Sequence, residues 1–191
     1  MIVLYILSYA LLLGFFLIER FVRQGKDTKN MSRTKHDKGS TTFISFAMGT
    51  AFILIPLSPL FNCLNLMPVF NFYIGYAGVL LGIVGLYVRY IAFTTLGRFF
   101  TRTLREQDEH TLVTTGIYHY IRHPGYLSDI LIFIGGSLAM GNLIPIIAVS
   151  ILFTIAYTYR IHVEEKMLIE VFGTDYIKYQ MKSKRLIPYV F

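Results

Sequence analysis

The sequence predicts an all-α integral membrane protein with about five transmembrane helices. Apolar residues make up 54% of the 191-residue chain, and they come in blocks that carry no charge except Asp129, rather than at the period of a half-buried helix or strand. The blocks are residues 2–18, 43–60, 69–88, 126–140 and 143–159. Each approaches the roughly 20 apolar residues that a helix needs to cross a bilayer, although the fourth is short.

The positions of the basic residues predict the orientation of these helices. Seven of the 18 Lys and Arg lie in 20–38, five in 89–122 and six in 160–185, whereas the loops 61–68 and 141–142 carry none. All cations therefore fall on one side of a five-pass chain, which the positive-inside rule assigns to the cytoplasm. We expect the N-terminus outside, the C-terminus in the cytoplasm and the lipid bilayer as a partner. No nucleic-acid motif accompanies the net charge of +7, so no nucleic-acid partner is expected.

The first helix is expected over residues 2–22, followed by a basic loop at 23–40. The second helix is expected over 41–57. Pro56 and Pro59 should end it, because proline removes a helix hydrogen bond and crowds the preceding turn.

The third helix, expected over residues 69–93, carries a stripe of glycines spaced three and four apart. The glycines are Gly75, Gly78, Gly82 and Gly85. Such a stripe favours close approach of another helix, and a dinucleotide-binding loop is rejected because no strand precedes it. We also consider that the stripe borders a gap through which a lipid acceptor enters.

Pro124 is expected to open the fourth helix, since the first turn tolerates a residue without an N–H. A tight outer turn at 141–142 should join it to the fifth helix, opened by Pro145 and ended by Gly173, a residue suited to a C-cap. The two helices should form an antiparallel hairpin. The basic and aromatic tail, residues 174–191, is expected to lie along the membrane interface.

The chain is expected to be a single membrane domain, residues 1–191. Residues 1–95 supply three helices, and residues 96–191 hold the chemistry. Within the second part, residues 110–113 and 116–126 together combine histidine, arginine and tyrosine, and residues 160–165 combine arginine, histidine and two glutamates. A tight hairpin makes the inner ends of its helices neighbours, so we expect these two clusters to meet and form a cytoplasmic pocket.

The spacing of the polar residues leaves several interpretations open. His119, His123 and His162 lack the spacing of a metal-ligand pair, so no metal is expected. Arg160 and Glu164 are four residues apart and share a helical face. That spacing fits a surface ion pair as well as a functional pair.

Five short motifs follow one another in the second half of the chain. They are H-T-L-V at 110–113, G-I-Y at 116–118, R-H-P-G-Y at 122–126, E-E at 164–165 and F-G-T-D-Y-I-K-Y at 172–179. In this order and spacing they resemble the isoprenylcysteine carboxyl methyltransferase family, and related phospholipid methyltransferases share the broader pattern. The resemblance covers about residues 96–188.

The resemblance implies S-adenosylmethionine as methyl donor, bound on the cytoplasmic side without a Rossmann domain. The implied cofactor contacts are His110, Thr111, Leu112, Val113, Tyr118, His123, Pro124, Gly125, Tyr126 and Glu164. Glu164 is implied to hold the donor's amino group. Arg122 and Arg160 are implied to orient the acceptor, and Glu165 joins them as a catalytic candidate.

The residue types suit this chemistry. Tyrosine faces favour a sulfonium cation, and a glutamate favours an ammonium group. A carboxylate acceptor is already an anion at neutral pH, and an arginine can hold it by a bidentate pair. An amine acceptor would instead need a general base, for which Glu165, Asp129 and His123 are candidates.

Ser128 and Asp129 stand where family members often have glycine and an apolar or aromatic residue. An acid inside a membrane helix is costly and is a functional candidate. The alternative is a structural pair with a cation such as Arg89 or Arg160. The departure leaves the identity of the acceptor open.

The leading expectation is an integral membrane methyltransferase acting on a lipidic or small apolar acceptor, with a carboxylate preferred. The alternatives are N-methylation of a phospholipid amine, S-methylation of a small thiol, a nicotinamide-dependent membrane reductase and a non-catalytic membrane protein. The short chain favours a bacterial or archaeal cytoplasmic membrane, with the site facing the cytoplasm.

Overall fold

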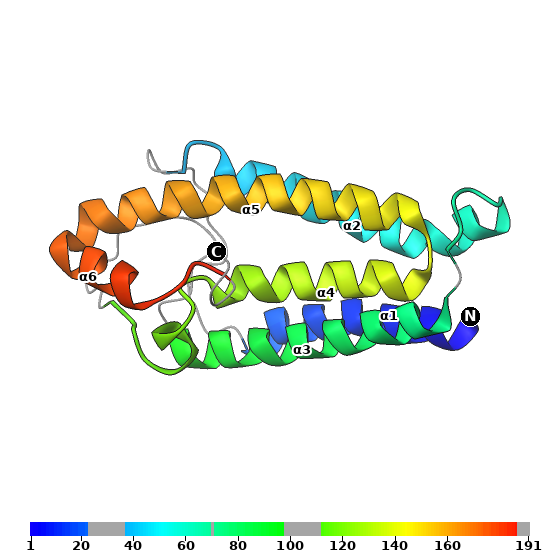
Figure 1. The fold of residues 1–191 in the computed structure, drawn as a ribbon, viewed down its shortest axis with the longest axis horizontal. Helices are drawn as coiled ribbons and strands as arrows, with labels where there is room; N and C mark the ends of the chain where they lie inside the picture. The colour runs from blue at the N-terminus through cyan, green and yellow to red at the C-terminus, as the bar shows by residue number, and fades with distance from the viewer. Residues whose placement is uncertain (23–36, 70, 98–111, 187–191) are drawn as a thin grey trace.

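The structure is a computed structural model that describes residues 1–22, 37–69, 71–97 and 112–186. Within these ranges the chain forms a bundle of long helices with a short helix beyond one end (Figure 1). The elements are α1 (Ile2–Leu17), η1 (Ile18–Val22), α2 (Ser40–Cys63), α3 (Phe72–Leu96), η3 (Gly116–His119), α4 (Pro124–Met140), α5 (Leu143–Phe172) and α6 (Thr174–Lys182). The described residues contain no strand, which agrees with the all-α prediction.

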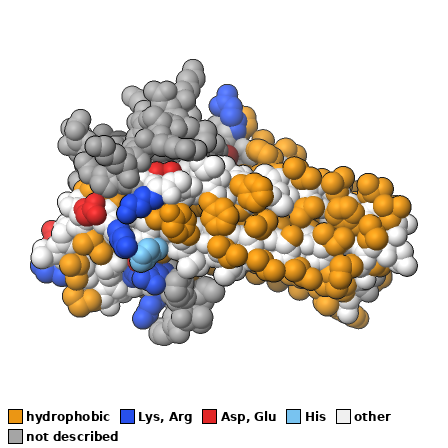
Figure 2. All heavy atoms as spheres, turned by 90° about the horizontal axis from the view of Figure 1, so that it is seen from above, with side chains coloured by type: hydrophobic (Ala, Val, Ile, Leu, Met, Phe, Trp, Pro, Cys, Tyr) orange, Lys and Arg blue, Asp and Glu red, His pale blue; other side chains and the backbone are white. Residues whose placement is uncertain are grey.

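Four helical segments are long and apolar enough to cross a membrane: α1 with η1, α2, α3 and α5. The fifth apolar helix, α4, has 17 residues, which corresponds to about 25 Å of rise. Figure 2 shows apolar side chains covering one part of the surface, with Lys, Arg and His gathered toward the other end. The number of five spans and the orientation of the termini stay predictions.

The prediction that two prolines end the second helix is wrong. Pro56 and Pro59 both lie inside α2, which continues to Cys63. Neighbouring side chains bond to the backbone in this region: Tyr9 Oη donates to the Pro56 carbonyl at 3.0 Å, and Ser58 Oγ donates to the Leu54 carbonyl at 3.2 Å. Membrane helices tolerate proline because neighbouring helices and hydroxyl side chains satisfy freed backbone groups.

The glycines of α3 lie against α1 and α4. A Cβ at Gly78 would stand 2.6 Å from the Gly135 carbonyl oxygen of α4, and one at Gly82 would stand 2.4 Å from a methyl carbon of Leu11 in α1. The prediction of close helix packing is therefore confirmed. The idea that this stripe borders a gap is wrong, because the adjoining helices fill the space.

At the centre of the bundle, α4 contacts each of the other four long helices. Its Phe133 ring packs between aromatic rings of α1 and α5, with centroids 5.2 Å from both Phe15 and Phe153. In Figure 1, α4 lies between the α2–α5 layer and the α1–α3 layer. The core therefore holds α4 from all sides, and with it the residues at its N-terminal end.

The ends of α4 and α5 follow from local chemistry. Gly141 adopts the left-handed conformation, φ 62°, after α4, and Asn142 Oδ1 accepts from the Ile144 N–H at 2.9 Å as the N-cap of α5. That helix therefore begins at Leu143, two residues before the predicted Pro145. It ends at Phe172 with Gly173 as C-cap, φ 55°, as the sequence predicts.

Candidate active site

The two predicted polar clusters meet where the start of α4 faces the last turns of α5. His123, the N-cap of α4, lies between two acids of α5. Its Nδ1 is 3.9 Å from Glu164 Oε2, and its Nε2 is 3.5 Å from Glu165 Oε1. The fold thus brings together residues that lie about 40 positions apart in sequence.

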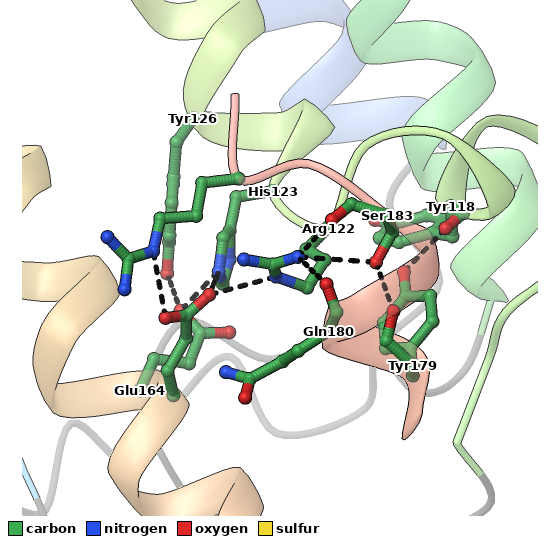
Figure 3. A network of polar contacts seen from close by, with 10 residues as sticks. Tyr118, Arg122, His123, Tyr126, Glu164, Tyr179, Gln180 and Ser183 are labelled. Atoms are coloured by element: carbon green, nitrogen blue, oxygen red, sulfur yellow. Dashed lines mark hydrogen bonds and ion pairs between the residues drawn. The ribbon is translucent and has the colours of Figure 1, made fainter. Parts of the chain in front are cut away.

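Tyr126 contacts three residues of this region, of which Figure 3 labels His123 and Glu164. Its ring stacks on His123, with centroids 5.5 Å apart and planes within 10°. Its hydroxyl donates to Glu164 Oε2 and accepts from Arg160 Nε at 3.1 Å. The Tyr126 oxygen therefore bridges Arg160 and Glu164, the two residues whose spacing in sequence suggested a direct pair.

Glu165 holds two arginines from different segments. Its Oε1 accepts from Arg122 Nε at 2.9 Å, and its Oε2 accepts from Arg185 Nε at 3.0 Å. The Glu165 side chain is only 6% exposed. Buried acids of this kind keep their charge through such paired hydrogen bonds.

Arg122 also contacts the end of α6. Its Nη1 donates to the carbonyls of Gln180, at 3.1 Å, and Ser183. These carbonyls belong to the final turn of α6 and its C-cap, where helix carbonyls lack internal partners and a cation is favoured. The role that the sequence predicts for Arg122, orienting an acceptor, stays a prediction.

Arg160 bonds to residues at the start of α2. Its Nη1 donates to Asp37 Oδ1 at 2.7 Å, Ser40 Oγ at 2.8 Å and Thr41 Oγ1 at 2.9 Å. Burial raises the pKa of the Asp37 carboxyl, but hydrogen bonds from Thr41 and Ser40 and the Arg160 charge outweigh it and hold that pKa below its usual value. A bidentate pair between Arg160 and an acceptor would need an exchange of these partners.

A separate buried network lies deeper in the bundle. Arg89 of α3 donates to Asp129 and to Glu19, and its guanidinium carbon lies 4.2 Å from the Phe15 ring centroid. Asp129 also accepts from Tyr157 Oη at 2.7 Å. The structural interpretation of Asp129, as the partner of a cation such as Arg89, is therefore confirmed.

Three buried tyrosines lie near the polar cluster: Tyr118 in η3, and Tyr176 and Tyr179 in α6. Burial and the nearby Glu164 charge raise the pKa of Tyr118 well above its usual value. Burial and the charges of Glu165 and Glu164 do the same for Tyr176. Burial raises the pKa of Tyr179 to about 12. All three hydroxyls are therefore neutral at physiological pH.

The remaining predicted site residues are placed as follows. Leu112 and Val113 are half-buried in the irregular segment before η3, and Pro124 and Gly125 form the first turn of α4. His110 and Thr111 lie outside the described residues. The predicted cofactor role of these six residues, and the pocket itself, stay predictions.

Sequence reasoning missed several residues of this region. Arg185 pairs with Glu165, and Asp37 pairs with Arg160. Tyr157 bonds to Asp129. The charge of Arg185 and Asp37 gives no signal in a basic chain, because many similar residues surround them. Tyr157 is polar within an apolar block, a signal that would have singled it out.

The chain resembles known proteins in sequence and in fold. Residues 78–170 match the model of the isoprenylcysteine carboxyl methyltransferase (ICMT) family. A "Probable protein-S-isoprenylcysteine O-methyltransferase" of Oryza sativa subsp. indica is 31% identical over 120 residues, which cover 62% of this chain and 63% of the relative. The "Protein-S-isoprenylcysteine O-methyltransferase" of Saccharomyces cerevisiae is 37% identical over 115 residues, 59% of this chain and 48% of the relative.

A solved structure titled as the eukaryotic intramembrane Ras methyltransferase ICMT shares the fold. Its TM-score is 0.63 at 23% identity, and the match covers 96% of this chain and 62% of that one. The matches therefore span half to two thirds of the length of these proteins. The three proteins named are eukaryotic by name or title, so they lend no support to the expected bacterial or archaeal membrane.

Proposed function

We propose, on the premise that this chain is a relative of the isoprenylcysteine carboxyl methyltransferase family, that it is an integral membrane methyltransferase acting on the carboxylate of an isoprenylcysteine. The donor is S-adenosylmethionine, as the family resemblance implies. The premise rests on the family match over residues 78–170 and on curated relatives of that name.

One observation carries the proposal: the R-H-P-G-Y motif and the E-E motif share one hydrogen-bonded cluster. Tyr126 donates to Glu164, and His123 lies 3.9 Å from the same carboxylate. Gathering a histidine, two glutamates and two arginines in one largely buried cluster is costly, and ionisable residues inside a membrane protein are candidates for a functional site.

The residues present fit the methyl donor. When bound, S-adenosylmethionine would supply an electrophilic methyl group on a sulfonium, together with an ammonium and a carboxylate. Glu164 is the least buried acid of the cluster, at 22% exposed, and can hold an ammonium. The Tyr118 and Tyr126 rings favour a cation. The buried Nε2 of His123 makes no hydrogen bond within the described residues and lies 3.5 Å from Glu165 Oε1.

The acceptor side fits an anion. A carboxylate is ionised at neutral pH and attacks without loss of a proton, so no general base is required. Arg160 and Arg185 bring two positive charges that an acceptor carboxylate could pair with by exchanging their present partners, Asp37 and Glu165. Methyl transfer then depends mainly on holding two reactants in line and excluding water. The helices α4 and α5 carry the cluster at the end of an apolar bundle, where a prenyl chain can stay in lipid.

Donor binding is the first test. S-adenosylhomocysteine should bind the detergent-purified protein in equilibrium titration, and Glu164→Gln should weaken it about tenfold, the loss of one charge-assisted hydrogen bond. The matched control is Glu170→Gln, the same change at an exposed position of α5. Equal losses of S-adenosylhomocysteine affinity in the two variants would show that Glu164 does not bind the donor.

Methyl transfer is the second test. A small S-farnesyl cysteine with a free carboxylate should accept labelled methyl groups, and the same compound with a carboxamide should not. Methyl transfer to phosphatidylethanolamine or to a small thiol, and not to the S-farnesyl cysteine, would show that the proposed acceptor is wrong. Binding of a nicotinamide nucleotide without S-adenosylhomocysteine binding would replace the proposed reaction.

A further inference from the structure

The segment after α6 pairs with the loop that precedes α4. Arg122 N–H donates to the Lys184 carbonyl at 2.8 Å, and His123 N–H donates to the Arg185 carbonyl at 3.1 Å. In return, Lys184 N–H donates to the Tyr120 carbonyl at 2.9 Å. The two segments run parallel and add a short ladder beside the R-H-P-G-Y motif.

Side chains strengthen the same contact. Tyr179 Oη of α6 donates to the Tyr118 carbonyl at 2.5 Å, and Arg122 Nη1 donates to the carbonyls of Gln180 and Ser183. Figure 3 shows Arg122 pointing toward Gln180 and Ser183, with Tyr179 beside Tyr118. Arg185 Nε reaches back to Glu165 at 3.0 Å. The connection therefore runs from the loop to the tail and from the tail to α5.

The loop held in this way carries two residues proposed for the donor, Tyr118 and His123. We propose that residues 179–185 are a positioning element for the donor site, and that Arg122 is a positioning residue of this element rather than a ligand of the acceptor. This inference rests on the proposed function, since it assigns the parts of that same site.

The geometry of Arg122 supports this assignment. Its side chain is 8% exposed, and its Nε and Nη1 donate to Glu165 and to the last carbonyls of α6. A bidentate pair with an acceptor carboxylate would take a donor from one of these partners and leave a buried carbonyl or carboxylate unsatisfied. Two of the three guanidinium nitrogens of Arg122, Nε and Nη1, thus hold α6 to the loop and to α5.

A positioning role and an acceptor role differ in the kinetic constant that they change. Loss of positioning misplaces Tyr118 and His123, so KM for the donor and Kd for S-adenosylhomocysteine rise while KM for the acceptor stays constant. Loss of an acceptor ligand raises KM for the acceptor and leaves KM for the donor and Kd for S-adenosylhomocysteine constant. A merely structural role lowers the thermal midpoint and the active fraction without moving either KM.

The ladder can be tested apart from any side chain by comparing Lys184→Pro with Lys184→Ala in the full-length protein. Both variants lose the side chain, but only proline also lacks the N–H that bonds to Tyr120. We expect Lys184→Pro to raise KM for S-adenosylmethionine about threefold to tenfold above the Lys184→Ala value, the effect of one lost hydrogen bond. Equal donor KM values in the two variants would overturn the proposal.

Arg122→Gln should show the same pattern, and Arg122→Lys, which keeps a charge and donors, should recover part of the donor affinity. Lys178→Ala, on the exposed face of α6, is the surface control and should match the wild type. A rise confined to acceptor KM in Arg122→Gln would restore the acceptor role and overturn this inference. A wild type that binds no S-adenosylhomocysteine would instead refute the proposed function.

Discussion

The imidazole of His123 lies parallel to the phenol ring of Tyr126, with centroids 5.5 Å apart and planes within 10°. These residues are separated by Pro124 and Gly125 in the first turn of α4. Because the Tyr126 hydroxyl also bonds to Glu164 of α5, the stack fixes the orientation of His123 relative to both acids. Changes to this pair should therefore alter ligand binding more than the stability of the bundle.

Tyr126→Phe keeps the ring and removes only the hydroxyl that joins Glu164 and Arg160. We expect S-adenosylhomocysteine to bind about tenfold more weakly, because a charge-assisted hydrogen bond contributes about 1.5–3 kcal/mol. Isothermal titration of the purified protein with S-adenosylhomocysteine measures this affinity. Tyr159→Phe, which loses an exposed bond to the Lys38 carbonyl at 2.9 Å, is the control. Unchanged affinity in Tyr126→Phe would show that the hydroxyl does not shape the donor site.

Gly78→Ala should destabilise the bundle. The new Cβ would lie 2.6 Å from the Gly135 oxygen and 2.9 Å from the Ala139 nitrogen, and these backbone atoms cannot move away cheaply. Overpacking of this kind costs about 1–3 kcal/mol. Gly49→Ala in α2 meets nothing within 4 Å and should be neutral or stabilising by up to about 1 kcal/mol, since alanine favours helix. Thermal unfolding in detergent compares the two, and a lower midpoint for Gly49→Ala than for Gly78→Ala would contradict the packing argument.

Arg89→Met should be strongly destabilising, because it removes the buried cation that both Glu19 and Asp129 contact. Breaking a buried ion pair costs about 3–5 kcal/mol, which corresponds to a fall in thermal midpoint of roughly 10 °C for a chain of this size. Adding Glu19→Gln and Asp129→Asn should recover much of the loss, since no uncompensated charge then remains. The exposed Arg20→Met provides the same change at the surface. A midpoint for Arg89→Met equal to that of Arg20→Met would rule out this account.

The two tyrosines of α6 should respond oppositely to loss of their hydroxyls. Tyr179→Phe loses the bond to the Tyr118 carbonyl and should cost about 1 kcal/mol. Tyr176 Oη is buried without a hydrogen-bond partner among the described residues, so Tyr176→Phe should leave the thermal midpoint unchanged or raise it. Differential scanning of both variants at neutral pH decides the point, and a larger loss in Tyr176→Phe would reveal a partner for that hydroxyl.

Alkaline pH should weaken the fold from about pH 10 upward. An unfolded tyrosine ionises near pH 10, whereas burial raises the pKa of Tyr179 to about 12. Between these values the unfolded state releases a proton that the folded state retains, so the free energy of unfolding falls as the pH rises. The thermal midpoint measured from pH 9 to 11 should therefore decrease, and less steeply in Tyr179→Phe. Identical slopes in the two proteins would show that Tyr179 does not contribute.

Hydropathy predicted the helices because each apolar block is longer than the interrupted apolar stripe of a helix in a soluble protein. It failed at Pro56, because a sequence rule for proline assumes water around the helix, whereas helices packed against other helices in a membrane tolerate proline. Glycine spacing on α3 predicted close packing but did not say which helices approach. The partners, α1 and α4, depend on tertiary arrangement that local spacing does not encode.

The candidate site was predicted in outline from residues with distinctive chemistry, such as His123, Tyr126 and Glu164. The partners of Arg122 were not predicted, because they are backbone carbonyls of α6, and any residue type supplies a carbonyl. The ladder between Tyr120 and Lys184 left no pattern either. Three residues are too few to show the alternation that marks a strand.

The ladder beside the R-H-P-G-Y motif also has a consequence for biosynthesis. Arg122 finds its partner Ser183 only 61 positions later in the chain. During translation, α4 and α5 must therefore enter the membrane, and α6 must leave the ribosome, before the loop acquires its final neighbours. A nascent chain that stalls after α5 would carry every motif residue up to Glu165 and still lack the contacts that order them.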